Sequence, residues 1–172
     1  GVATDGTAYC WGFNQRYQLG DGTYGTRMEP VPVSGELMFK SVSAGSNHTC
    51  AVATDGAAYC WDDNNYGQIG NGTEAYREGS EWDERPVMTP TPVAGALTGG
   101  VITGPEPGSS EHPGSTRQGG IVSFTSISAG VYYTCGISTD GAAYCWGDGG
   151  QGKLGHGSQI GWAAPIPVAD WR

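Results

Sequence analysis

The chain has 172 residues, and its 31 glycines and 10 prolines approach the content of disordered proteins. Its six tryptophans and nine tyrosines argue against disorder and favour a turn-dense β protein. Eight basic residues against 17 acidic ones give a net charge of −9, which argues against a nucleic-acid partner and against binding to anionic membranes. No apolar run reaches the roughly 18–20 residues that a membrane-spanning helix needs, so no membrane insertion is expected.

A repeat of about 50 residues organises the chain. Its most regular part reads TDGTAYCWG at 4–12, TDGAAYCWD at 54–62 and TDGAAYCWG at 139–147. A glycine-rich turn follows each copy, at 14–23, 64–73 and 149–158, and then a proline-flanked valine, at 30–33, 90–93 and 165–168. We expect a partial first repeat at 1–38, a second at 39–93 with an acidic insertion at 74–85, a Gly/Pro/Ser-rich insertion at 94–122, and a third repeat at 123–172 that includes the start of a further unit.

Within one repeat the local signals predict four short strands. The segments 48–52 and 57–61 are rich in β-formers, and the Thr-Asp-Gly between them predicts a tight hairpin. The segments 39–45 and 124–130 alternate apolar and polar residues, and the proline-rich segments fit edge strands, where a missing N–H is tolerated. Four antiparallel strands repeated at this period predict a blade of a β-propeller; a β-solenoid is the alternative architecture.

Four of the five cysteines occupy matched positions in this hairpin. Counting outward from the turn places Cys50 directly opposite Cys60, and Cys135 opposite Cys145, at a separation that suits disulfides. Reduced buried thiols are the alternative, and zinc is disfavoured because the spacing is not that of a zinc site. The same spacing places the partner of Cys10 one residue before Gly1, and the chain is therefore expected to be a segment of a longer protein.

The unit at 42–73 resembles the repeat of the regulator of chromosome condensation family. The resemblance rests on Ser-Ala-Gly before the first hairpin strand, Asp-Gly at the turn, Tyr-Cys-Trp-Gly and Gly-Gln-Ile/Leu-Gly. It implies an all-β propeller, usually of seven blades, of which about three are present. The cysteine pairs resemble the exported bacterial branch, which implies a secreted, periplasmic or cell-surface location. Two departures are Tyr133 in place of His48, and Asp62 where the other repeats have glycine.

For each candidate functional residue in the repeats, a structural role explains the residue better than a chemical one. We expect His48 to tie a turn to a neighbouring strand, and the repeated Tyr-x-Trp pairs to pack between blades. The acidic turn Asp62–Asn65 could hold calcium, but its counterparts lack the carboxylates. No Ser/His/Asp or Cys/His set clusters, and the glycine-rich turns lack a phosphate-loop lysine. We therefore predict no catalytic residues, no metal and no cofactor.

The insertions in the second repeat are where function is expected, because loops on a rigid scaffold carry binding roles. The first insertion combines aromatic residues with charges, and its candidate partner contacts are Tyr76, Arg77, Trp82 and Arg85. The segment 95–121 fits a flexible solvated loop. We predict a non-enzymatic interaction scaffold that binds a protein partner or enters a larger assembly. The alternative is a propeller-face enzyme or carbohydrate-binding module completed by blades outside these residues.

Overall fold

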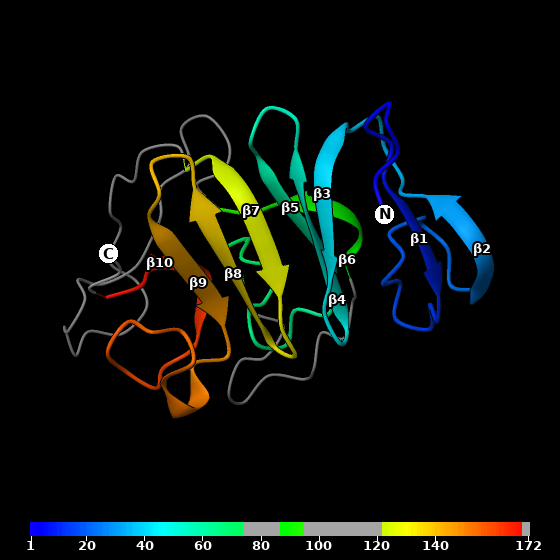
Figure 1. Cartoon of the computed structure of the whole chain (residues 1–172). Helices are drawn as coiled ribbons and strands as arrows, with labels where there is room; N and C mark the ends of the chain where they lie inside the picture. Colours follow the sequence, from blue (N-terminus) through cyan, green and yellow to red (C-terminus); the bar gives the residue numbers. More distant parts are fainter. Residues whose placement is uncertain (74–86, 95–121, 170–172) are drawn as a thin grey trace.

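The computed structural model describes residues 1–73, 87–94 and 122–169. Ten strands and one 3₁₀ turn make up this part of the chain (Figure 1). Their bounds are β1 Tyr9–Gly12, β2 Arg27–Pro32, β3 Phe39–Ala44, β4 His48–Ala53, β5 Ala58–Asp62, β6 Val87–Pro92, β7 Phe124–Ala129, β8 Tyr133–Ser138, β9 Ala143–Gly147, η1 Gly150–Gly152 and β10 Trp162–Pro167. No helix in the described ranges is long and apolar enough to cross a membrane.

The strands form three antiparallel sheets that stack side by side (Figure 1). Blade 2 has the order β3-β4-β5-β6, and blade 3 repeats it as β7-β8-β9-β10. Blade 1 contains β1 and β2, together with an isolated bridge between Val2 and Ala8. The predicted four-stranded antiparallel unit is therefore confirmed in blades 2 and 3. The proline-rich strands β6 and β10 are edge strands, as their missing N–H groups require.

The hairpin between β4 and β5 has the register that the sequence predicts. The Ala53 amide donates a hydrogen bond to the carbonyl of Ala57 at 2.8 Å, and the Gly56 amide donates one to the carbonyl of Ala53 at 2.9 Å. Counting outward from this turn, Cys50 pairs with Cys60. The hairpin of blade 3 repeats this arrangement and pairs Cys135 with Cys145.

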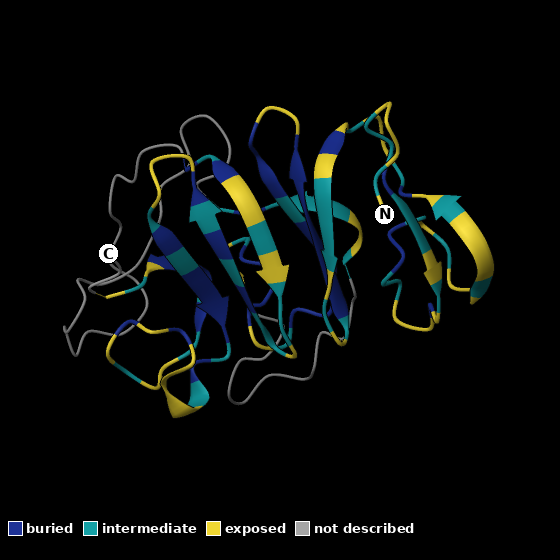
Figure 2. Cartoon of the chain, viewed as in Figure 1, coloured by how far each residue is buried: buried dark blue, intermediate teal, exposed yellow. Residues whose placement is uncertain are grey.

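The hydrophobic core lies between the blades. One cluster fills the space between blades 2 and 3 and includes Val52, Ile69, Phe124 and Trp146. A second lies between blades 1 and 2 around Phe39 and Trp61. Figure 2 shows the result: the middle strands β4 and β5 are mostly buried, whereas the hairpin tips and much of β2 are exposed. Each blade is therefore stabilised mainly by its neighbours, as in other repeat architectures.

Candidate binding surface

In blades 2 and 3, one tryptophan joins the blade to the preceding one. The Trp61 indole N–H donates to the carbonyl oxygen of Gln18 at 3.0 Å, and the Trp146 indole N–H donates to that of Gln68 at 2.9 Å. Both indoles are 0% exposed. The carbonyl of Gln68 also accepts a 2.9 Å hydrogen bond from the Thr134 hydroxyl. The predicted packing between blades is therefore correct for these two tryptophans.

A glycine makes room for each buried indole. A Cβ atom on Gly20 would lie 2.6 Å from Nε1 of Trp61, and one on Gly70 would lie 2.5 Å from Nε1 of Trp146. Any larger residue at these positions would displace the indole. The Gly-Gln-Ile/Leu-Gly motif therefore has a physical role: the glutamine carbonyl accepts the hydrogen bond, and the final glycine admits the ring.

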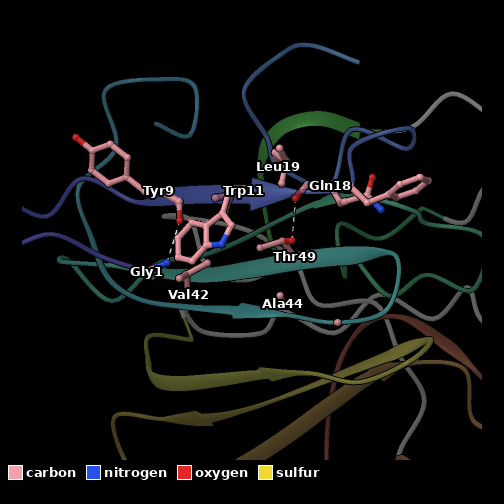
Figure 3. A pocket seen from close by; sticks show the side chains of 11 residues that line it. Gly1, Tyr9, Trp11, Gln18, Leu19, Val42, Ala44 and Thr49 are labelled. Atoms are coloured by element: carbon pink, nitrogen blue, oxygen red, sulfur yellow. Dashed lines mark hydrogen bonds between the residues drawn. The ribbon is translucent and has the colours of Figure 1, made fainter. Parts of the chain in front are cut away.

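Trp11 differs from its two counterparts and is 55% exposed. Within the described residues no preceding blade offers a turn to receive it. It lines a cavity of about 290 Å³ between blades 1 and 2, together with Cys10, Val42 and Thr49 (Figure 3). The structure therefore does not bury Trp11 as it buries Trp61 and Trp146, each of which contacts the turn of a preceding blade.

His48 ties two blades together, as its position at the start of β4 suggests. Its Nε2 atom lies 2.8 Å from the hydroxyl oxygen of Thr134 in blade 3. Burial lowers the pKa of His48 from 6.5 to about 4, because the charged imidazolium would lose its hydration. The imidazole is therefore neutral at pH 7 and acts as a structural link.

The two predicted cysteine pairs are bridged in the structure. The sulfur atoms of Cys50 and Cys60 are 2.09 Å apart, and those of Cys135 and Cys145 are 2.12 Å apart. Cys10 forms no disulfide with the other cysteines of residues 1–172, and desolvation raises the pKa of its partly buried thiol. A raised pKa keeps this thiol protonated and poorly nucleophilic at neutral pH.

The side chains of the acidic turn after β5 form hydrogen bonds within the turn. Asn64 accepts from the Ile69 amide at 3.1 Å and donates to the Thr73 carbonyl at 2.8 Å. Asp63 accepts from the Asn65 amide at 3.0 Å. Among the residues that the structure describes, no group of three His, Cys, Asp or Glu side chains could hold a metal ion.

The carboxyl group of Asp62 is buried, which the place of this residue in the repeat does not predict. It is 1% exposed, and neither carboxylate oxygen has a hydrogen-bond partner. Burial, and secondarily the charge of Asp63, raises its pKa from 3.8 to about 8, although Arg16 acts in the opposite direction. The φ angle of Asp62 is 86°, in the left-handed region. The equivalent residues of the other two repeats, Gly12 and Gly147, have φ angles of 106° and 104°. The glycine-to-aspartate difference between repeats is the one signal of this in the sequence.

Exposed apolar side chains gather on the connections at one end of the blades, which we call the turn face. These connections follow β1, β5 and β9 and include the β7–β8 turn, at the bottom of Figure 1. The exposed residues are Phe13, Tyr24, Tyr66, Val131 and Ile160. The Tyr66 ring also packs against Tyr132 of the next blade, with centroids 4.8 Å apart.

The predicted contact residues Tyr76, Arg77, Trp82 and Arg85 lie outside the described residues. The residues on either side of their insertion are described. Thr73 is held by Asn64, and Val87 pairs with Asp62 at the end of β5. The insertion therefore leaves and rejoins the scaffold at the turn face.

Comparison with solved structures establishes the fold. Two crystal structures of the yeast RCC1 protein Prp20, one with Kap60 bound, match 98% of this chain with TM-scores of 0.66, at 19% and 22% identity. Human WBSCR16 matches 98% of the chain with a TM-score of 0.50, at 18% identity. The chain covers 34%, 35% and 50% of those three chains, so it spans between a third and a half of their lengths.

Sequence comparison identifies the family. No curated protein sequence matches the chain. Two profiles of the regulator of chromosome condensation (RCC1) repeat do match, one over residues 5–52 and the other over residues 39–68 and 124–153. Together they cover more than half of the chain and all three blades. The chain belongs to the RCC1 repeat family, and its three antiparallel sheets are part of a β-propeller.

Proposed function

We propose that this chain is a non-enzymatic interaction scaffold of an exported protein, which binds a protein partner through the insertion at 74–85. The observation that carries the proposal is the turn face. Five large apolar side chains are exposed on these connections, whereas Trp61, Trp146, Phe124 and Ile69 are fully buried. Exposed aromatic residues beside charges are typical of the anchors of protein interfaces.

The insertion adds to this surface the residue types that bind proteins. It lies between Thr73 and Val87 and contains five acidic residues, two arginines and two aromatic residues. The same connection in blade 1 is short, so the scaffold does not need the additional residues. The turn beside it presents Tyr66, which is 47% exposed. A partner that contacts the insertion would therefore also reach the turn face.

Family relatives support a protein partner. Yeast Prp20 is described in complex with Kap60 and with binding properties to Gsp1p and histones. RCC1-type propellers commonly mediate protein interactions, and we extend that coarse role, without those partners, to this chain. The disulfides at the two hairpins support export, because such bonds persist in oxidising compartments.

The experiment replaces residues 74–85 with the short link at 24–29. Because Asn64 already closes the preceding turn, the exchange should leave the fold intact, as measured by circular dichroism and melting temperature. We expect it to abolish recovery of the partner in a pull-down from the native source. The matched control is Met38→Ser, which removes a 44% exposed side chain just before β3, at the opposite end of the blades, where the Thr54 amide donates to the Met38 carbonyl. Equal recovery with the exchanged and the original loop would refute the binding role of 74–85.

A further inference from the structure

The two edges of each blade differ in what covers their backbone groups. We call β3 and β7 the inner edges, because these two strands contact one another, and β6 and β10 the outer edges. At the inner edges, side chains of blade 2 bond to the backbone of blade 3. The Ala129 amide donates to the Ser43 hydroxyl at 3.0 Å, and the Lys40 ammonium donates to the Phe124 carbonyl at 3.0 Å. The neighbouring blade therefore satisfies backbone groups of an inner edge.

The outer edges have a proline where a strand would present its outward amide. In blade 2 the Val93 amide donates to the Ala58 carbonyl at 2.9 Å, toward β5. Because successive residues of an antiparallel strand direct their amides to opposite sides, the backbone nitrogen of Pro92 faces away from β5. The same alternation applies to Pro32 and Pro167, since the valine amides that follow them donate at 2.9 Å to Ala8 and Ala143.

A second proline and a bulge interrupt each outer edge further. Pro30, Pro90 and Pro165 each lie two residues before the first proline, so neither position has an amide hydrogen. The register with the neighbouring strand also shifts beside this second proline, as between Cys60 and Asp62 in blade 2. Prolines and bulges at an edge both oppose pairing with a further strand.

We infer that the outer rim of the blades, formed by β2, β6 and β10, is closed to strand addition. An added strand needs alternating backbone donors and acceptors along the edge. Here the carbonyl groups remain, but ring carbons occupy the places of the amide hydrogens and prevent close approach. A protein partner must therefore contact side chains, such as those of the turn face, rather than extend a sheet. Blade 2 has this edge with a blade on either side of it (Figure 1).

The test restores the missing amides in blade 2. The double variant Pro90→Thr/Pro92→Thr gives β6 two further backbone donors, with a residue type that the strand already has at 89 and 91. The matched control is Thr89→Val/Thr91→Val, which raises the β-propensity of the same strand without adding an amide. Circular dichroism and urea unfolding check that each chain folds. Light scattering then measures the average mass of the wild type and of both variants over a range of concentrations.

Edge-to-edge pairing of two copies should raise the average mass of the proline variant about twofold or more above that of the wild type at the same concentration. The valine control should match the wild type. Equal masses of the folded proline variant and the wild type, or an equal rise in the control, would overturn the inference.

If the variant in β6 does not fold, Pro30→Thr/Pro32→Thr makes the same change in β2. Failure of both to fold would show that the prolines are needed to form the blade, and would also count against a role in closing its edge. None of these substitutions lies in 74–85, so the result is independent of the partner-binding loop.

Discussion

Replacing Asp62 with glycine should stabilise the protein. The native residue combines two unfavourable features: a left-handed backbone and a buried carboxyl group with no hydrogen-bond partner. Glycine occupies the same position in blades 1 and 3, at φ values of 106° and 104°, so the backbone of the blade accepts it. The substitution removes the carboxyl group and relieves the backbone strain together.

The magnitude follows from the shift in the pKa of Asp62 from 3.8 to about 8. A carboxyl group whose pKa is raised on folding binds its proton more tightly in the folded state. The free energy of unfolding therefore falls as pH rises from about 4 to about 8, at up to 1.36 kcal/mol per pH unit. At pH 7 the penalty approaches about 4 kcal/mol. The relief of backbone strain, about 1 kcal/mol, is offset by the greater chain entropy of glycine in the unfolded state. We expect a gain of about 2–4 kcal/mol at pH 7 and little gain at pH 4.

Urea unfolding of both proteins at several pH values between about 4 and 8.5 measures this difference. Asp62→Asn is the matched control, since it removes the charge but keeps a side chain at positive φ. It should flatten the pH dependence in the same way and gain less stability than the glycine variant. A glycine variant that is no more stable than the wild type at pH 7, or a difference that does not change with pH, would refute the reasoning.

Three further predictions concern the bridges and the junctions. Alkylation of the denatured, unreduced protein should label Cys10 and leave the four bridged cysteines unlabelled; mass spectrometry would contradict the bridges if it found more than one label. Gly70→Ala should destabilise the protein by at least about 2 kcal/mol, because its Cβ would lie 2.5 Å from the Trp146 indole. Gly72→Ala, at an equally positive φ but in open space, should cost only the backbone strain in the same urea titration. The pKa of His48 falls from 6.5 to about 4 on folding, so the unfolded state binds the imidazole proton more tightly. The free energy of unfolding should therefore fall as the pH is lowered from about 6.5 to about 4. His48→Gln should remove that acid-side loss, and an unchanged pH profile would count against it.

Local rules were sufficient to predict much of this fold from the residues. The register that opposes Cys50 and Cys60 follows from a three-residue turn and the two-residue period of a strand, neither of which depends on distant parts of the chain. The edge positions of β6 and β10 follow from prolines that cannot donate a hydrogen bond. The order of the four strands follows from short connections between antiparallel neighbours. The repeat and its family are therefore recognisable from the residues alone.

Burial depended on the tertiary structure. Trp11 and Trp61 have nearly the same sequence around them, yet Trp11 is 55% exposed and Trp61 is fully buried. Among the described residues, Trp61 meets the turn of a preceding blade and Trp11 does not. Asp62 ends β5 as Gly12 ends β1 and Gly147 ends β9, and only the tertiary structure shows that its carboxyl group is buried without a hydrogen-bond partner. Strand register is a short-range property of the chain, whereas desolvation is decided by which atoms of other blades exclude water from a side chain.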